Sequence, residues 1–240
     1  MSRGVFPKRL IPLLVKQFDA IVEFPKRRKY RWLLNAIATA RAQPFFIEIG
    51  SNDGVVHDPI FRHVLDNNWR GILVEPVAYY FEKLTRNYRS NSNLVFENIA
   101  ISNREETRDF FRVQEGLSFM PNWCDGLGSF YLDVLLKHRW IIPNLADHII
   151  KETVQCMSFE ALLEKHRVDS IDLLMIDTEG YDYEIIKQID FAKTIPHVII
   201  YEHKHLPKSD RRECEALLRA EHYTVRKDIA NTLAVAAVRS

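Results

Sequence analysis

The fold is decided by the stretch FFIEIGSNDG at residues 45–54. It predicts a short buried strand that runs directly into a Gly-x-x-x-Gly turn. In an open α/β sheet, such a turn lines the crevice beyond the carboxyl ends of the strands, where ligands bind. Gly50 would let the backbone approach a ligand closely, Gly54 would let the chain enter the next helix tightly, and Asn52 tolerates left-handed geometry. A plain tight turn is the competing interpretation of this loop taken alone.

This turn differs from the dinucleotide fingerprint Gly-x-Gly-x-x-Gly. It leaves no compact glycine turn for a pyrophosphate at the start of the helix. Glu48 instead places a carboxylate at the strand tip, where it would repel a pyrophosphate but suit the ammonium group of an amino-acid moiety. The pattern therefore argues against a nicotinamide-dependent oxidoreductase, which stays an alternative within the same fold class.

Outward from this stretch, strand and helix patterns alternate along the chain. Repeated β-α-β units predict a doubly wound α/β domain with a mostly parallel sheet and helices on both faces. Strands are expected at 45–49, 71–75, 94–101, 107–113, 154–157, 171–176, 195–202, 223–227 and 233–238. Helices are expected at 58–67, 77–88, 158–166, 183–188 and 210–222.

Two regions depart from this alternation. Residues 1–42 are predicted to form a helical N-terminal cap, with one amphipathic helix to about Phe24 and a second through Ala42. Because this region is basic, a docking surface for an anionic acceptor or a membrane surface is the alternative. Residues 43–240 would form the ligand-binding domain, with an aromatic insertion at about 115–150 as a substrate cover.

Composition narrows the classes of partner. The chain has 240 residues with 33 Lys plus Arg and 32 Asp plus Glu, so its overall charge gives no footprint for nucleic acid. The three cysteines are widely spaced, which indicates reduced cytoplasmic thiols rather than a zinc knuckle or a disulfide framework. The apolar runs are too short to span a bilayer. A cytoplasmic protein without a nucleic-acid partner is expected, and homo-oligomerisation stays open.

Glu75 ends the second predicted strand, 25 residues after Gly50. In this topology an acidic residue there accepts hydrogen bonds from both ribose hydroxyls of an adenosine, since its two oxygens match a vicinal diol. Ile99 and Ala100 end the third predicted strand at the same edge of the sheet, and small apolar residues suit the flat face of an adenine. A solvated strand end and ordinary core are the plainer interpretations of these residues.

Two carboxylates, Asp177 and Glu179, follow the predicted strand 171–176 just before Gly180. If strand geometry persists, both side chains point to the same side, and their like charges then need a cation, a proton or hydrogen bonds. A divalent metal ligated by oxygen is one interpretation. Capping of the following helix is the other.

His203 and His205 follow the next predicted strand. Both are candidate general bases, because an unperturbed imidazole titrates near neutrality. Such a base could deprotonate an acceptor hydroxyl as it attacks a methyl group. A polar loop without a catalytic role is an equal alternative for His203.

Four of these motifs, at the ends of four strands and in the same order, resemble the FkbM-type methyltransferase family. The resemblance covers roughly residues 44–239, with little match before residue 40 or over 115–150. One departure is Met175, which stands where the family commonly has Lys. The segments that carry the resemblance are IEIGSNDGVVHDPIF at 47–61, WRGILVEPVAYYFEKLTRNY at 69–88, NIAIS at 98–102 and IDLLMIDTEGYDYEII at 171–186.

The resemblance implies a Rossmann-like class I methyltransferase fold, with a seven-stranded, mostly parallel sheet whose last strand is antiparallel. It implies S-adenosylmethionine (SAM) as methyl donor and usually a hydroxyl acceptor, on a sugar, a glycan or a natural-product scaffold. Asp177 would face the methyl group, and Asp177 or His203 would take the hydroxyl proton. The residues expected to contact SAM are Glu48, Gly50, Ser51, Asn52, Asp53, Gly54, Glu75, Pro76, Ile99 and Ala100.

Two further functions compete with this hypothesis. One is an adaptor that keeps the fold and binds SAM without turnover, which binding without methyl transfer across a broad acceptor panel would favour. The other is a nucleic-acid methyltransferase, supported only by the basic N-terminus, which tight and salt-sensitive RNA binding would favour. A divalent metal, with Asp177 and Glu179 as candidate ligands, also stays open.

Overall fold

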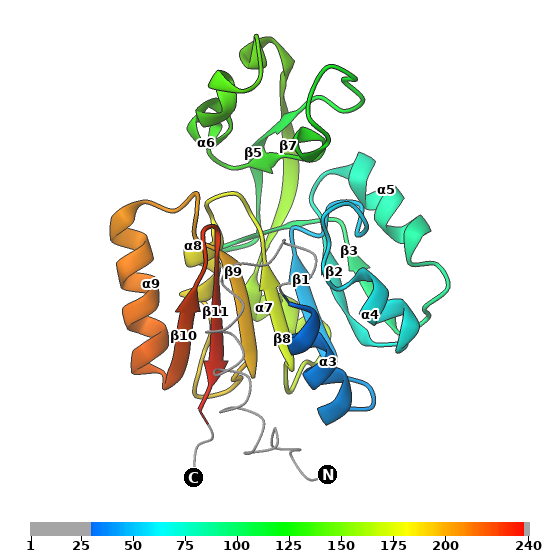
Figure 1. Ribbon diagram of the computed structural model, residues 1–240, viewed down its shortest axis with the longest axis vertical. Coiled ribbons are helices and arrows are strands. Elements are labelled where there is room, and N and C mark those ends of the chain that lie inside the picture. The colour runs from blue at the N-terminus through cyan, green and yellow to red at the C-terminus, as the bar shows by residue number, and fades with distance from the viewer. Residues whose placement is uncertain (1–29, 238–240) are drawn as a thin grey trace.

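The computed structural model describes residues 30–237, in which a broad α/β body carries a narrower β-rich arm (Figure 1). We use the word arm for residues 106–158. The amphipathic helix expected up to about Phe24 lies outside the described residues. The helix expected after it is present as α3 (Arg31–Ala40).

The body is built on a seven-stranded sheet with the strand order β10-β11-β9-β8-β1-β2-β3. All strands run parallel except β11, which is antiparallel to both of its neighbours. This confirms the doubly wound sheet with an antiparallel last strand, and the strand order reverses between β1 and β8, beside the 45–54 stretch. The strands are β1 (Phe45–Ile49), β2 (Arg70–Val74), β3 (Leu94–Glu97), β8 (Leu173–Ile176), β9 (Val198–Glu202), β10 (Tyr223–Lys227) and β11 (Asn231–Ala236).

Helices cover both faces of this sheet. Alternate residues of a strand point to opposite sides, and because both sets are mostly apolar here, each face needs a covering layer. Phe46 of β1 packs on the side of α3, α4 and α5, whereas Ile47 and Ile49 pack on the side of α7, α8 and α9. Burial on both faces explains why the central strands are almost continuously apolar. The helices are α4 (Phe61–Asp66), α5 (Ala78–Asn87), α7 (Phe159–Lys165), α8 (Asp182–Ile186) and α9 (Lys208–Ala220).

The strand predicted at 94–101 is wrong in one respect, since the chain there forms two strands in two different sheets. After β3, the side-chain Nδ2 of Asn98 donates hydrogen bonds to the backbone oxygens of Glu75 and Pro76, at 2.8 and 3.0 Å. These bonds hold the chain at the end of the sheet while it turns away into β4 (Ala100–Ser102). The apolar pattern continues through the turn, so periodicity alone does not mark the break.

The arm is organised by a second, four-stranded sheet in the order β4-β7-β5-β6, in which β4 comes from the segment just before the arm. Its centre is a long antiparallel pairing of β5 with β7, where the sequence predicted only an edge strand at 107–113 and a short strand at 154–157. Between them, the insertion at about 115–150 forms short helices over a small core of its own, which includes Leu127 and Leu135. The elements are β5 (Glu106–Val113), β6 (Gly128–Ser129), α6 (Leu132–Leu136), β7 (Ile149–Ser158) and the 3-10 helices η1 (Asn122–Cys124), η2 (Lys137–Trp140) and η3 (Leu145–His148).

Two predictions from composition bear on this structure. The three cysteines are buried free thiols, as predicted from their spacing. Within residues 30–237, every helix is too short or too polar to cross a membrane.

Candidate functional site

The Gly50–Gly54 loop lies at the carboxyl edge of the sheet, where the strand order reverses between β1 and β8. Gly50 has φ +85°, and a Cβ at this position would lie 1.9 Å from the backbone oxygen of Asp177. Only glycine fits so close an approach with a positive φ. Asn52 has φ +50°, the left-handed geometry expected for it. The loop is therefore held tightly against the end of β8.

Ser51 and Asp53 shape this loop from within. The hydroxyl of Ser51 donates to the backbone oxygen of Glu48 at 3.1 Å. The Oδ1 atom of Asp53 accepts hydrogen bonds from the backbone N–H groups of Val55 and Val56, at 2.9 and 2.8 Å. Both side chains thus preorganise the turn, and their contact with SAM stays a prediction.

Glu75 follows the end of β2 and faces the same loop. Its two carboxylate oxygens accept hydrogen bonds from the backbone N–H groups of Asn52 and Val77, each at 2.8 Å. Burial raises the pKa of Glu75 to about 7, although these two hydrogen bonds lower it. Each carboxylate oxygen has further acceptor capacity. Glu75 can therefore still accept the ribose hydroxyls that the sequence assigned to it.

Glu48 is the second buried carboxyl group at this edge. Burial, with the charge of nearby Asp58, raises the pKa of Glu48 well above its usual range, although the Ser51 hydrogen bond lowers it. Its Oε2 atom is buried and has no hydrogen-bond partner among the described residues. An unsatisfied buried polar group costs about 1–3 kcal/mol, and more when it is charged. A cation bound beside Glu48 would offset that cost, and the contact of Glu48 with an ammonium group stays a prediction.

The loop after β8 brings two predicted carboxylates together. Glu179 has φ +52°, so strand geometry does not continue beyond the end of β8. The carboxylates of Asp177, Glu179 and Glu202 nevertheless offer oxygens that all lie within 4.8 Å of one another. The first two are close, as predicted, but a left-handed turn rather than strand alternation places them there.

Asp182 holds this loop in position, a role that the sequence did not reveal. Its carboxylate accepts hydrogen bonds from the Thr178 hydroxyl at 2.8 Å and from the backbone N–H of Glu202 at 3.0 Å. Burial, with the charge of Asp177, raises the pKa of Asp182 to about 7. Acidic residues are common in the first turn of any helix, so its sequence position alone did not distinguish it.

The two histidines after β9 have different neighbours. The Nδ1 atom of His203 lies 2.9 Å from the Thr232 hydroxyl on β11. The Nε2 atom of His205 lies 3.2 Å from Oε2 of Glu179 and 3.6 Å from Oε2 of Glu202. The structure therefore brings His205 to the acidic cluster, whereas the role of His203 as a base stays a prediction.

A third histidine, His138 on η2, reaches this cluster from the arm. It offers a ring nitrogen within 4.8 Å of the ligand atoms of Glu179 and His205. The Ser129 hydroxyl ties the arm to the same loop by donating to the backbone oxygen of Glu179 at 2.7 Å. Burial lowers the pKa of His138, and lowers that of His205 to about 3. The sequence missed His138 because the insertion matched no pattern.

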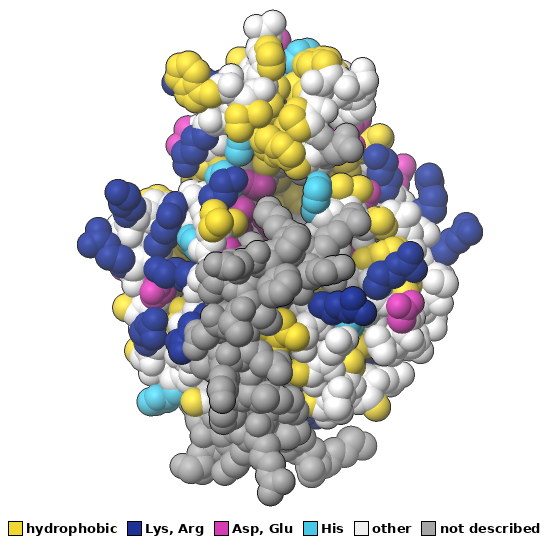
Figure 2. Space-filling view, in the orientation of Figure 1, with side chains coloured by type: hydrophobic (Ala, Val, Ile, Leu, Met, Phe, Trp, Pro, Cys, Tyr) yellow, Lys and Arg dark blue, Asp and Glu magenta, His cyan; other side chains and the backbone are white. Residues whose placement is uncertain are grey.

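The arm also contacts the Gly50–Gly54 loop and α5. A Cβ on Gly126 would lie 1.7 Å from Nδ2 of Asn52, so the arm backbone rests directly on that side chain. The Tyr80 hydroxyl of α5 donates to Oδ1 of Asp125 at 2.7 Å. Figure 2 shows the junction of arm and body, where acidic and histidine side chains gather below the hydrophobic surface of the arm.

The remaining predicted contacts with SAM lie at the ends of β2 and β3. Pro76 accepts a hydrogen bond from Asn98 on its backbone oxygen. Ala100 is buried opposite Cys156, and Ile99 packs against the same core. These apolar groups are beside the strand ends as expected, and their contact with adenine stays a prediction.

Sequence reasoning also missed Asp58, which lies close to Glu48. It accepts hydrogen bonds from the Tyr88 hydroxyl at 2.9 Å and from the backbone N–H of Ile60 at 2.7 Å. Burial raises the pKa of Asp58 above its usual range. Asp58 lies in the 47–61 segment that resembles the family, and this was the one signal in the sequence. The resemblance did not indicate what Asp58 does.

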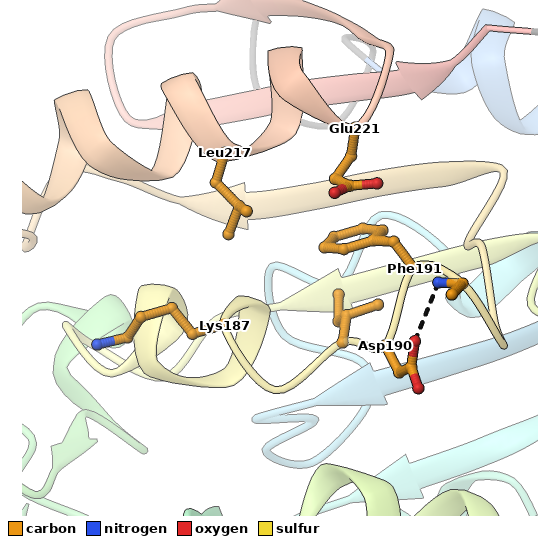
Figure 3. Close-up of a pocket in the computed structure, with 7 residues that line it drawn as sticks. Lys187, Asp190, Phe191, Leu217 and Glu221 are labelled. Carbon is orange, nitrogen blue, oxygen red and sulfur yellow. Dashed lines mark hydrogen bonds between the residues drawn. The ribbon is translucent and has the colours of Figure 1, made fainter.

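A pocket of about 380 Å³ lies elsewhere, between α8 and α9 (Figure 3). Its lining includes Lys187, Asp190, Phe191, Leu217 and Glu221. These residues precede the amino ends of β9 and β10, so the pocket lies toward the edge of the sheet opposite the Gly50–Gly54 loop. It is therefore separate from the candidate site.

Comparison with solved structures shows the fold. A methyltransferase FkbM from Methylobacillus flagellatus KT is similar with a TM-score of 0.50 and 10% identity, and the match covers 95% of this chain and 60% of that one. The ribosomal protein L11 methylase from Lactobacillus delbrueckii subsp. bulgaricus gives a TM-score of 0.42 and 11% identity, covering 88% and 78%. No curated protein matches the sequence significantly. The strand order and the first similarity show a Rossmann-like class I methyltransferase fold.

The sequence itself matches the family described as "Methyltransferase FkbM domain" over residues 48–226. The match begins at Glu48 on β1 and ends within β10, so it includes the candidate site, the arm and every strand of the body except β11. Because it spans well over half of the sequence, the chain belongs to the FkbM methyltransferase family.

Proposed function

We propose that this methyltransferase transfers the methyl group of SAM to a hydroxyl oxygen on a sugar, a glycan or a natural-product scaffold. The observation that carries the proposal is a pair of buried carboxyl groups beside the Gly50–Gly54 loop, Glu48 on β1 and Glu75 directly after the adjacent strand β2. One of them has an unpaired oxygen within the described residues, and the other is still able to accept a diol.

The carboxyl edge fits SAM in charge and in chemistry. Glu48 would hold the ammonium group through its Oε2 atom, and Glu75 would accept the ribose hydroxyls. Ile99 and Ala100 would flank the adenine. When bound, SAM supplies a methyl group already activated by its sulfonium, and the negative edge attracts that positive charge.

The chain itself would align the acceptor and remove its proton. Since the methyl group is already activated, alignment of nucleophile, methyl carbon and sulfur is the main requirement. Asp177 is exposed at the edge beside Gly50, which makes it the first candidate for the base that accepts the hydroxyl proton. His203 is the second candidate, although its ring faces Thr232.

The arm would act as the substrate cover. It already contacts the Gly50–Gly54 loop through Gly126, so a ligand in the crevice would lie beneath it. Its exposed aromatic rings include Trp123, Tyr131 and Trp140, and such rings suit the apolar face of a sugar. Closure of the arm over the acceptor would exclude water from the transfer.

Binding of SAM and of S-adenosylhomocysteine (SAH) is the direct test. Isothermal titration calorimetry on the wild type and on Glu75→Gln is expected to show at least about a 10-fold weaker affinity in the variant, because the hydrogen bonds to a carboxylate are charge-assisted. Glu221→Gln, in the distant pocket, is the matched control and should bind as the wild type does. Unchanged affinity in a folded Glu75→Gln protein would overturn the ribose assignment.

Turnover decides between methyl transfer and the non-catalytic alternative. Labelled methyl transfer from SAM should be measured across a panel of sugars, glycans and natural-product alcohols. Product on a hydroxyl oxygen supports the proposal, whereas SAM binding without product on any acceptor supports an adaptor. The nicotinamide-dependent oxidoreductase is tested by the melting temperature of the protein with NAD and with SAH. Only SAH is expected to raise the melting temperature.

A further inference from the structure

A cluster of metal-ligand side chains lies where the arm meets the body, and the proposed methyl transfer makes no use of it. His138 comes from η2 of the arm, Glu179 from the loop after β8 and His205 from the loop after β9. One ligand atom from each lies within 4.8 Å of the other two. Three segments far apart in sequence therefore converge on one point with the residue types that bind transition metals.

Two side chains at this point are buried with an unused polar atom. The side chain of His138 belongs to a residue only 7% exposed, and its Nε2 atom has no hydrogen-bond partner in the described part of the chain. Glu202 is equally buried, and its Oε2 atom likewise has no hydrogen-bond partner within residues 30–237. Leaving such buried groups unsatisfied is unfavourable. A cation bound between His138, Glu179 and His205 would satisfy the imidazole of His138 and would lie close to the carboxylate of Glu202.

The spacing of the closest atoms matches tetrahedral coordination. The Nε2 atom of His205 lies 3.2 Å from Oε2 of Glu179 and 3.6 Å from Oε2 of Glu202. Ligands about 2.0–2.1 Å from a tetrahedral Zn²⁺ lie about 3.3 Å from one another. The ligand atom of His138 lies within 4.8 Å of those of Glu179 and His205, so the arm supplies a third ligand at the same point.

Charge points to the same conclusion. The carboxylates of Asp177, Glu179 and Glu202 lie within 4.8 Å of one another, and like charges at this distance repel unless a cation or protons compensate. Two imidazoles in the set favour Zn²⁺ and similar transition metals, whereas Mg²⁺ and Ca²⁺ prefer oxygen ligands alone.

We propose that His138, Glu179 and His205 bind a Zn²⁺ ion that clamps the arm to the body. Two imidazoles and one carboxylate leave a fourth coordination position for water or for Glu202, whose Oε2 atom lies 3.6 Å from Nε2 of His205. His138 is the arm ligand, and the other ligands come from the body. Binding of the ion would therefore stabilise the arm over the Gly50–Gly54 loop. This inference does not depend on the identity of the methyl acceptor.

The test uses the full chain, freed of metal by a chelator. Isothermal titration calorimetry with Zn²⁺ is expected to show a single strong site, and Mg²⁺ should not bind there. Co²⁺ should give the visible absorption of tetrahedral coordination. His138→Phe keeps a ring of similar shape beside Trp123, whose ring centroid lies 5.0 Å away, but removes the ligand. Loss of a residue that only supports a metal ligand weakens binding by about 10–100-fold. Since His138 is proposed as a ligand itself, we expect His138→Phe to weaken Zn²⁺ binding by more than this.

His148→Phe is the matched control, because His148 lies in the same arm but packs against Phe119. It should bind Zn²⁺ as the wild type does. His205→Gln is a second ligand variant, for the case in which His138→Phe does not fold. Wild-type protein that binds no Zn²⁺, or ligand variants that bind it normally, would overturn the site. SAH affinity, measured on the same metal-free samples, reports on the proposed function separately, so either proposal can fail without the other.

Discussion

At the scale of single residues, several acidic side chains lie at the edge of the sheet where the parallel strands end. Burial raises the pKa values of these side chains toward or above neutrality. The pKa values of Glu75 and Asp182 are raised to about 7, whereas that of Glu48 lies well above its usual range. A carboxyl group with a pKa near 7 changes its charge when a ligand adds or removes a hydrogen bond. Ligand binding at this edge is therefore expected to be linked to protons.

We expect the affinity for SAH to increase with pH from about 6 to 8. The ribose hydroxyls are donors, so they bind best to ionised Glu75, and binding lowers the pKa of this group and releases a proton. Below that pKa the affinity should fall by up to about 10-fold per pH unit. Calorimetry at several pH values, in buffers of different ionisation enthalpy, measures both quantities. Glu75→Gln should flatten the profile, and an equally steep profile in that variant would refute the linkage to Glu75.

Asp182→Asn should destabilise the protein by about 1–3 kcal/mol. Both carboxylate oxygens accept hydrogen bonds, from Thr178 and Glu202, and the amide NH₂ of Asn would face one of these donors. Urea unfolding measures the change. The control is Asp190→Asn, because Asp190 lies in an exposed turn, where Asn can still accept the N–H of Ala192 and the lost ion pair with Lys193 is exposed and contributes little. Equal stability in both variants would contradict the prediction.

At the scale of elements, the arm has its own core but shares an aromatic contact with the body. Phe130 at the base of the arm packs edge-to-face on Tyr181, with ring centroids 5.0 Å apart. The guanidinium of Arg108 lies over both rings, 4.1 Å from the Phe130 centroid and 5.2 Å from that of Tyr181. Cation–π and aromatic contacts of this kind each contribute about 0.5–1.5 kcal/mol. The arm is thus seated on the loop that contains Asp177 and Glu179.

Gly126→Ala should weaken SAH binding by at least about 10-fold if the arm must lie on the Gly50–Gly54 loop. Gly126 has φ +91°, and its added Cβ would overlap the Asn52 side chain at 1.7 Å. Gly116→Ala is the matched control, because Gly116 has φ +73° but its Cβ would meet no described atom within 4 Å. Both variants have a non-glycine residue at a positive φ, so backbone strain is common to the two. A difference between their SAH affinities, measured by calorimetry, therefore reports on the contact with Asn52. The same affinity in both would show that this contact is not needed.

At the scale of the whole molecule, the arm contacts the body at the carboxyl ends of the central strands, while the separate pocket lies toward the opposite edge of the sheet. The contacts between the two parts include Tyr80 with Asp125 and Ser129 with Glu179. A ligand bound beside the Gly50–Gly54 loop, as proposed, would lie at the junction of body and arm. It would therefore contact both parts.

We expect SAH binding to slow amide hydrogen exchange in the arm turn at 125–129 as well as in the Gly50–Gly54 loop. Ordering of one side of the junction should stabilise the other, because the two are in direct contact. Hydrogen exchange followed by mass spectrometry measures both segments. The pocket segment at 187–192 is the internal control and should not change. Protection confined to the body would show that the arm does not respond to the ligand.

The alternation of strands and helices, most of the strand ends and the Gly50–Gly54 turn could be predicted from the sequence, whereas the end of β3 could not. Each depends on residues within a few positions of one another, so hydrophobic periodicity and the conformational limits of Gly and Asn are sufficient. Glu75 and Asp177 were found in the same way, because a parallel sheet gathers the carboxyl ends of its strands at one edge.

Only the tertiary structure decided the second sheet, the place of His138 and the burial of Glu48. Periodicity identifies a strand such as β5 but not its partner, and β7 follows it only after the whole 115–150 insertion. His138 and His205 come together because two separate layers pack, which no local pattern records. The charge of a carboxyl group also depends on the atoms that surround it, and those atoms come from segments far away in the sequence.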